Sequence, residues 1–356
     1  MLASCAVRHG SRFLRRVVAI LAPVVWACGA GQAPAPAAAQ PRAAAASSAP
    51  RSGARSARRQ LAAIGDENVT RLQRKWEVAA GGFGRAVAVN RKLRRVAYSA
   101  GSLIRLYDTG SGKPAGTIRT CTDLIRGGMS FEQSRLFVVC EEGVRIYEGT
   151  KPSAQKLPIH NTRVSAAAYA WPRLALGHHD GVVRIYGLDG SPTVEIPVPG
   201  PPIDVKSLAL TRDGTKIAVA WIQGSIWWWE TARPGTPHKL VRNDNESDTV
   251  AFNQDGSLFA EEGRTNFTTV WRFGGDPATR HAEVKNGDWV KRILFTRDAK
   301  WLVRGGSDGL EAAEIDGPRR VMLDARGNVE DVALDEDGAT LAAADRDGRL
   351  TYFAVR

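Results

Sequence analysis

The amino-acid sequence predicts an all-β protein, and three observations carry this prediction. The 356 residues include 36 Gly and 18 Pro that lie between short apolar runs, which is typical of many strands joined by tight turns. One unit of about 40 residues recurs seven times, and its apolar runs indicate four short strands. An apolar run before the first unit can supply the fourth strand that the last unit lacks. Together these features predict a seven-bladed β-propeller with four-stranded blades.

The first two strands are the clearest part of the unit. They form apolar runs on both sides of a turn, as in LALTRDGTKIAVA at 208–220 and VALDEDGATLAAA at 332–344. Seven copies at this period indicate a closed or stacked repeat array and argue against a two-domain enzyme. One apolar residue of the second strand recurs at intervals of 38 to 43 residues: Val96, Leu136, Leu174, Ile217, Phe259, Leu302 and Leu341.

A third and a fourth strand are expected to complete each unit. The third carries an aromatic residue in six copies, at 104–108, 144–148, 183–187, 226–230, 268–272 and 350–354, and the sixth copy at 310–315 lacks it. The fourth is expected at 116–119, 155–159, 193–198, 238–241, 280–284 and 320–323.

The seventh unit has no fourth strand of its own after residue 354. An apolar run at 74–78 (RKWEV) precedes the first unit and has no unit before it. We expect this N-terminal strand to complete the seventh blade, because pairing the two ends closes the ring and removes its free strand edges.

The units resemble WD repeats over residues 68–356. The likeness rests on Asp-Gly turns such as Asp213-Gly214 and on pairs such as Tyr107-Asp108 and Trp229-Glu230, which stand where that family has Trp-Asp. The Gly-His pair that precedes the first strand in the family is missing, so the hydrogen-bond tetrad built on its His is not expected. The resemblance implies a propeller that serves as a scaffold for other proteins.

The N-terminal region has the pattern of an export signal. Four arginines precede an apolar run of 11 residues, Val17 to Ala27, which is too short to span a bilayer. Val25-Trp26-Ala27-Cys28 resembles a bacterial lipobox, which implies a signal peptide at 1–27 and lipid attachment at Cys28. Cleavage further on, after Ala39, is the alternative. Residues 28–67 are rich in Ala and Pro and are expected to form a disordered tether.

The net charge of +12 does not indicate nucleic-acid binding by the folded part. Residues 1–75 hold 12 Lys and Arg against 2 Asp and Glu, whereas the remainder holds 37 against 35. Nucleic-acid affinity comes mainly from neutralising phosphates with a basic face. We therefore expect no nucleic-acid partner.

Two cysteines remain in the folded part. Export favours a disulfide between Cys121 and Cys140, since both lie near one rim of the same blade. The alternative is a pair of buried thiols, because spacing alone does not establish the bond geometry.

The sequence predicts a binding surface on the rim that holds the connections between blades and the turns between second and third strands. Binding residues concentrate on loops that a rigid scaffold displays. The alternative for the two Trp is packing back onto their own blades. The candidates are Phe83, His178, His179, Trp221, Trp289 and Arg304.

The predicted function is a non-enzymatic scaffold in the bacterial envelope that holds a protein or peptide. We expect a monomer that touches the membrane only through its lipid anchor, with no cofactor and no metal. His178 and His179 are adjacent, so on a strand they point to opposite faces and rarely reach one ion. The alternative is a quinoprotein-like enzyme, because Ile64 to Trp76 (IGDENVTRLQRKW) resembles the opening of pyrroloquinoline-quinone dehydrogenase propellers.

Overall fold

The computed structural model describes residues 61–356, except 156, 158–161, 190, 192, 198, 200–203, 222–224, 243–246, 264–265 and 274–277. The expected signal peptide at 1–27, the lipid site at Cys28 and most of the expected tether at 28–67 lie outside these residues. Within the described part, no helix is long and apolar enough to cross a membrane.

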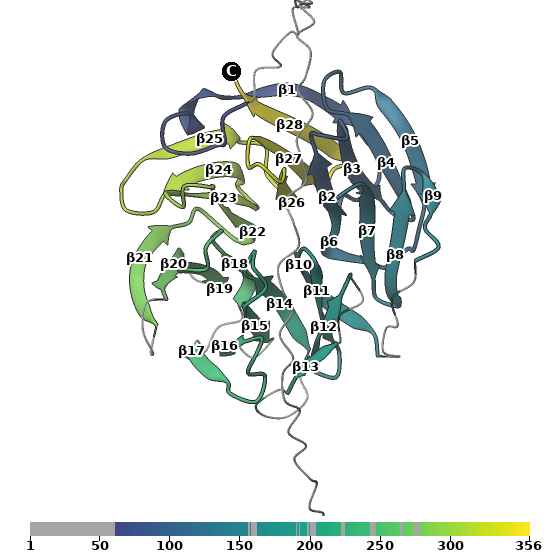
Figure 1. The fold of residues 1–356 in the computed structure, drawn as a ribbon. Coiled ribbons are helices and arrows are strands. Elements are labelled where there is room, and N and C mark those ends of the chain that lie inside the picture. Colours follow the sequence, from purple (N-terminus) through teal and green to yellow (C-terminus); the bar gives the residue numbers. More distant parts are fainter. Residues whose placement is uncertain are drawn as a thin grey trace, which may run out of the picture. The chain divides into compact units, whose positions relative to one another are not determined.

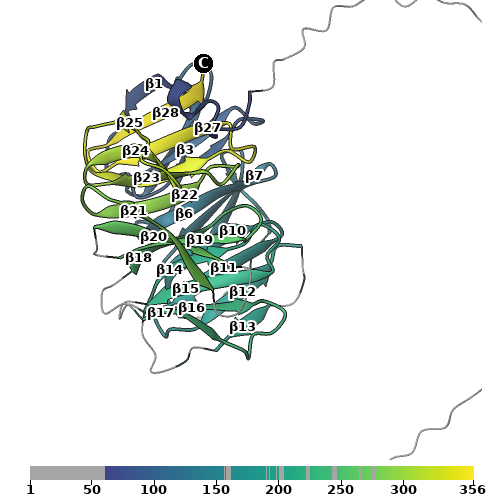
Figure 2. The same cartoon turned by 90° about the vertical axis from the view of Figure 1, so that its left-hand side faces the viewer.

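The described strands form seven antiparallel sheets of four strands each, arranged as a ring (Figure 1). This confirms the predicted seven-bladed β-propeller with four-stranded blades. The first strand of every blade lies nearest the centre of the ring and the fourth lies outermost (Figure 1). Figure 2 shows the same sheets from the side.

The two inner strands of each blade are joined by tight turns. The first strands are β2 (Val87–Asn90), β6 (Leu124–Glu132), β10 (Val164–Ala170), β14 (Val205–Leu210), β18 (Ser247–Phe252), β22 (Val290–Phe295) and β26 (Val329–Leu334). The second strands are β3 (Arg95–Ala100), β7 (Arg135–Cys140), β11 (Arg173–His178), β15 (Lys216–Trp221), β19 (Leu258–Gly263), β23 (Trp301–Gly306) and β27 (Thr340–Asp345).

The two outer strands follow in the same order. The third strands are β4 (Leu103–Asp108), β8 (Gly143–Glu148), β12 (Val183–Gly187), β16 (Ser225–Glu230), β20 (Phe267–Arg272), β24 (Gly309–Glu314) and β28 (Arg349–Val355). The fourth strands are β5 (Pro114–Arg119), β9 (Lys151–Pro152), β13 (Val194–Ile196), β17 (His238–Arg242), β21 (Thr279–Lys285), β25 (Arg320–Asp324) and β1 (Leu72–Ala79).

One predicted strand is misplaced. The fourth strand of the second blade was expected at 155–159, but the structure has the two-residue β9 at Lys151–Pro152; residues 156, 158 and 159 of the expected run lie outside the described residues. Tyr147 and Glu148 of β8 pair directly with this short strand. The turn after β8 is therefore tighter than the apolar residues of the 155–159 run indicated.

The recurring apolar residue forms the core of each blade. All seven copies lie on second strands and are almost fully buried. Each is paired with a third-strand residue that is aromatic in six blades, as in Ile217 with Trp229 and Leu341 with Phe353. In the sixth blade Leu302 pairs with Ala313 instead. This is the copy whose third strand lacks an aromatic residue in the sequence.

The ring closes as predicted. Strand β1 pairs with β28 over seven residue pairs, from Leu72 with Val355 to Ala79 with Arg349. The ring of Trp76 stacks on Tyr352 with 5.1 Å between centroids. The seventh blade thus combines an N-terminal strand with three C-terminal ones.

Packing against the propeller begins earlier than the expected boundary at residue 68. Ile64 is fully buried, and its amide N–H donates to the carbonyl of Gly338 at 2.7 Å. A short 3-10 helix, η1 (Val69–Arg71), then leads into β1. Ile64 thus lies beside the β26–β27 turn, and the amide of Asp66 donates to Asp298 in the β22–β23 turn at 2.7 Å.

Cys121 and Cys140 are joined by a disulfide with 6.2 Å between their Cα atoms. Cys121 lies just before β6, and Cys140 ends β7 opposite Leu124. The bridge ties the connection that enters the second blade to that blade's second strand. Both cysteines are buried in the core shared with the first blade.

We predict that peptide mapping of the unreduced protein will recover Cys121 and Cys140 in one cross-linked pair. Reduction is expected to lower the free energy of unfolding by about 3 kcal/mol, because the bridge closes a loop of roughly 20 residues in the unfolded chain. Denaturant titrations with and without reductant measure this change. Alkylation of both cysteines before reduction would contradict the bridge.

Candidate functional site

One face of the propeller carries all the residues singled out as a binding surface. We call it the upper rim; it consists of the connections between blades and the turns between second and third strands. Backbone hydrogen bonds join these two kinds of loop, as between Ser307 N and Trp289 O at 3.0 Å and between Gly81 N and Gly348 O at 2.9 Å. The opposite face, the lower rim, holds the turns between first and second strands.

Three of the predicted residues are exposed on the upper rim. Phe83 is 37% exposed and Trp289 is 41% exposed. His179 is also exposed, and its Nδ1 lies 3.2 Å from Asp204 Oδ2.

The other three predicted residues are buried, so their assignment to the binding surface was wrong. Trp221 packs edge-on against Trp229 in the core of the fourth blade. His178 ends β11 inside the sheet, with its Nδ1 3.0 Å from the carbonyl oxygen of Thr162. His178 is the last residue of β11, whereas His179 begins the turn that follows, where its side chain is exposed.

Arg304 joins the fifth and sixth blades instead of facing solvent. Its Nη1 donates to Thr268 Oγ1 and to the carbonyl of Val284, both at 3.2 Å, and its Nη2 donates to Glu311. Burial lowers the pKa of this guanidinium, while the carboxylate of Glu311 raises it. The two terminal amino groups of Arg304 have acceptors, which offsets the cost of burying the charge, whereas its Nε has no hydrogen-bond partner among the described residues.

The two exposed aromatic rings are flanked by cations. The indole N–H of Trp289 donates to Asp248 Oδ2 at 2.5 Å, and Lys291 Nζ lies 5.5 Å from the ring. The guanidinium carbons of Arg85 and Arg346 each lie 5.7 Å from the centre of the Phe83 ring. These contacts hold the rings in place while a large part of each stays exposed.

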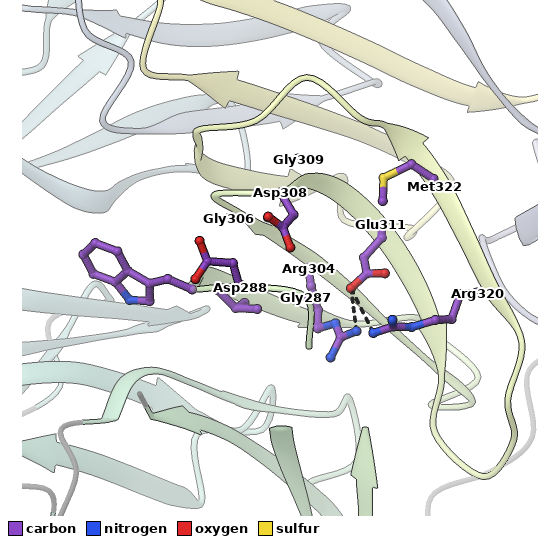
Figure 3. Close-up of a pocket in the computed structure, with 12 residues that line it drawn as sticks. Gly287, Asp288, Arg304, Gly306, Asp308, Gly309, Glu311, Arg320 and Met322 are labelled. Atoms are coloured by element: carbon purple, nitrogen blue, oxygen red, sulfur yellow. Dashed lines mark hydrogen bonds and ion pairs between the residues drawn. The ribbon is translucent and has the colours of Figure 1, made fainter. Parts of the chain in front are cut away.

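A small cavity lies beside Trp289, between the loop at 287–289 and strands β23 to β25 (Figure 3). Its volume is about 90 Å³, below the roughly 300 Å³ of the smallest usual ligand pockets. Glu311 points between Arg304 and Arg320 on its wall and pairs with both (Figure 3). The cavity therefore suits one side chain of a partner better than a free small molecule.

The centre of the ring contains a channel whose lining residues overlap from one segment to the next. The segment at the upper rim has a volume of about 230 Å³, and the middle segment about 280 Å³. The segment at the lower rim has about 540 Å³ and is lined by aromatic residues, including Phe131, Tyr169 and Trp171. We call the opening at the upper rim the channel mouth.

A repeated irregularity shapes the channel mouth. In five blades the first strand contains a β-bulge near its start, and the residue left out of the pairing is Ser165, Lys206, Asp248, Lys291 or Glu330. In the second blade the pairing is interrupted between Leu124 and Met129, a stretch that includes Arg126. Bulges re-aim side chains, and here four of these residues line the mouth as charged groups: Arg126, Lys206, Asp248 and Lys291.

The sequence interpretation missed these charged residues. The available signal was their common position, directly after the first apolar residue of the strand, as in Val205-Lys206, Val290-Lys291 and Val329-Glu330. In a regular strand the side chain of that residue points to one face of the sheet. In a bulge the residue is left out of the pairing, and its side chain points in a different direction.

Two buried carboxyl groups lie near the mouth on β19. Burial raises the pKa of Glu261 to about 7. Burial and the nearby Asp248 raise the pKa of Glu262 to about 9. At neutral pH Glu262 is therefore protonated. Its Oε1 accepts a hydrogen bond from Asn286 Nδ2 at 3.2 Å, and Asn286 in turn accepts one from Arg304, so the three side chains form one network.

No set of three or more His, Cys, Asp or Glu residues in the described ranges is arranged to hold a metal ion. The chain matches no known protein-family model, and no curated protein is similar to it. The WD-repeat likeness therefore remains a resemblance, and the fold and the rim carry the functional argument.

We predict that the free energy of unfolding falls as pH rises from about 4.5 towards 9. The native Glu262 keeps its proton up to a pKa of about 9, whereas the unfolded chain releases it near 4.3, so the native state binds more protons across this window. E262Q should flatten the fall between pH 7 and 9, where Glu261 contributes less. Denaturant titrations across this pH series measure the slope.

The exposed Glu67 supplies the control. E67Q should keep the wild-type pH dependence. An E262Q variant with an unchanged slope would show that Glu262 is ionised in the native protein.

Proposed function

We propose that this propeller is an exported, lipid-tethered and non-enzymatic platform that holds a protein or peptide partner on its upper rim. The observation that carries the proposal is the pair of exposed rings, Phe83 and Trp289, each beside at least one cation. Exposed aromatic residues on loops of a rigid scaffold are the residue types that anchor protein interfaces.

The surroundings of Trp289 favour partner binding. Its indole N–H is already bonded to Asp248, so a partner that covers the ring leaves no polar group unpaired. The side-chain-sized cavity beside it is a place for a partner residue. Because the ring is held in place before binding, less conformational entropy is lost on association.

The remaining parts of the proposal are supported by the sequence and by the disulfide. The charged leader, the short apolar run and the lipobox favour export with lipid on Cys28. A disulfide fits an oxidising compartment. The first described residues lie at the lower rim, where Ile64 bonds to Gly338, so this N-terminal segment leaves the upper rim uncovered.

A quinoprotein-like enzyme is the alternative function. It is supported only by the resemblance of Ile64 to Trp76 to the opening of such propellers. In the structure this segment contributes to closing the ring, since Leu72 pairs with Val355 and Trp76 stacks on Tyr352. A quinone absorption band in the purified protein would favour the enzyme over the platform.

We predict that W289A and F83A, together, will remove partner capture without unfolding the protein. Each truncation is expected to cost roughly 2 kcal/mol or more of binding, because anchor residues dominate interface energies. Cross-linked envelope fractions from wild-type and variant cells, compared by quantitative mass spectrometry, measure the loss. The thermal midpoint of each purified variant reports folding.

L93A is the matched control, because Leu93 is 36% exposed on a lower-rim turn. It should retain capture. W221A removes a core side chain and should lower the thermal midpoint. If capture survives in the double variant and fails in L93A, the partner binds the lower rim and the proposal is wrong.

We also predict that mature protein from cell envelopes begins at Cys28 and carries acyl groups. The lipobox places the cleavage directly before this cysteine. Intact-protein and N-terminal peptide mass spectrometry measure both features, and C28A should release the protein from the membrane fraction. Protein that retains residues 1–27 would contradict export.

A further inference from the structure

The channel mouth presents cations to solvent and keeps its carboxylates underneath. The side chains of Arg126, Lys206 and Arg292 are 38%, 33% and 28% exposed. Their partners Glu330, Asp248 and Asp331 are at most 4% exposed. An approaching ligand therefore meets positive groups first.

The buried carboxylates hold these cations in position. Glu330 pairs with Lys291 through one oxygen and with Arg126 through the other, at 3.3 Å. Lys206 pairs with Asp248 at 3.2 Å, and Arg292 with Asp331 at 3.4 Å. Four cations thus share three carboxylates, and the mouth keeps one positive charge in excess.

Arg292 lies across the narrow part of the channel. It belongs to the sixth blade, yet its guanidinium reaches Gly127 of the second blade. A Cβ atom at Gly127 would lie only 3.0 Å from Arg292 Nη1. It lines both the mouth and the middle segment of the channel. Its guanidinium therefore stands where a ligand entering from the upper rim would meet it.

The two terminal amino groups of this guanidinium, Nη1 and Nη2, are available for binding. The ion pair with Asp331 is made through Nε, and neither Nη1 nor Nη2 has a hydrogen-bond acceptor among the residues that the structure describes. The two terminal amino groups of an arginine form a planar fork that matches the two oxygens of a carboxylate. The exposed cations Arg126 and Lys206 add attraction for an anion on the same mouth.

We infer that the channel mouth binds a carboxylate side chain from an acidic segment of a peptide partner, with Arg292 as its bidentate anchor. This inference rests on the proposed platform function and adds the chemistry of the partner. The mouth volume of about 230 Å³ accommodates one side chain. Trp289 stands next to it through the contact with Lys291, so acidic residues next to an apolar one fit the rim.

A peptide fits these observations better than a nucleic acid. The mouth carries four cations against three carboxylates, while the chain beyond residue 75 as a whole holds 37 basic and 35 acidic residues. A nucleic acid needs an extended basic surface because it contacts several phosphates at once. A single carboxylate needs one fork and a few neighbouring charges.

The test is titration of the mature protein with a blocked hexaglutamate peptide, using blocked hexaglutamine and inorganic phosphate at equal ionic strength as separate probes. We expect the wild type to bind hexaglutamate and not hexaglutamine. R292K should weaken binding at least about tenfold, because lysine keeps the charge beside Asp331 but lacks the fork. R126Q should weaken it less, since Glu330 keeps Lys291 as its partner.

R163Q is the matched control. Arg163 is an upper-rim arginine, 69% exposed and paired with Glu141 outside the residues that line the mouth, so R163Q should bind hexaglutamate as the wild type does. Thermal midpoints of all variants verify folding, and R126Q keeps the test valid if R292K does not fold. Unchanged binding in R292K and R126Q would overturn the inference, as would equal binding of hexaglutamine.

Three further outcomes bear on this inference and separate it from the proposed function. Binding of phosphate without hexaglutamate would make the mouth a small-anion site and overturn the peptide assignment. Loss of capture in the Phe83 and Trp289 variants with no hexaglutamate binding would leave the platform standing and reject the carboxylate anchor. Hexaglutamate binding that depends on Arg292, together with capture that ignores the rings, would reject the aromatic anchors alone.

Discussion

The structure depends on the pairing of β1 with β28. Each blade buries its sheet faces against two neighbours, so an open array would expose one sheet face and one strand edge at each end. Seven residue pairs and the stacking of Trp76 on Tyr352 join the N-terminal strand to the C-terminal ones. Because the ring is closed, the seven first strands surround one central channel, and the upper rim is a continuous surface.

The repeated bulge connects this architecture to the chemistry of the rim. A regular first strand would alternate its side chains between its two faces. The bulge inserts one extra residue into five blades at the same place. In these five blades, the residue left out of the pairing is Ser165, Lys206, Asp248, Lys291 or Glu330. Each of these blades thus contributes its own bulged residue near the channel mouth.

The contact between the fifth and sixth blades contains a buried polar network beside its apolar core. Arg304, Asn286, Thr268 and Glu262 form a buried network there, at a place where apolar residues would also pack. Its directional hydrogen bonds favour one arrangement of the two blades, although Arg304 Nε and Glu262 Oε2 have no hydrogen-bond partner among the described residues.

The sequence by itself determined the number of blades, the strand order and the closing strand, because these follow from the period of a residue such as Ile217 and from short-range turn chemistry. It also pointed to Phe83 and Trp289, whose rings are exposed. It misassigned His178, Trp221 and Arg304, since residues at the end of a second strand face the core or solvent according to strand register and neighbouring blades. Only the tertiary structure brought Arg126, Arg292 and Glu330 to one channel mouth, because they come from three blades and the strand irregularities beside them depend on pairing within each blade.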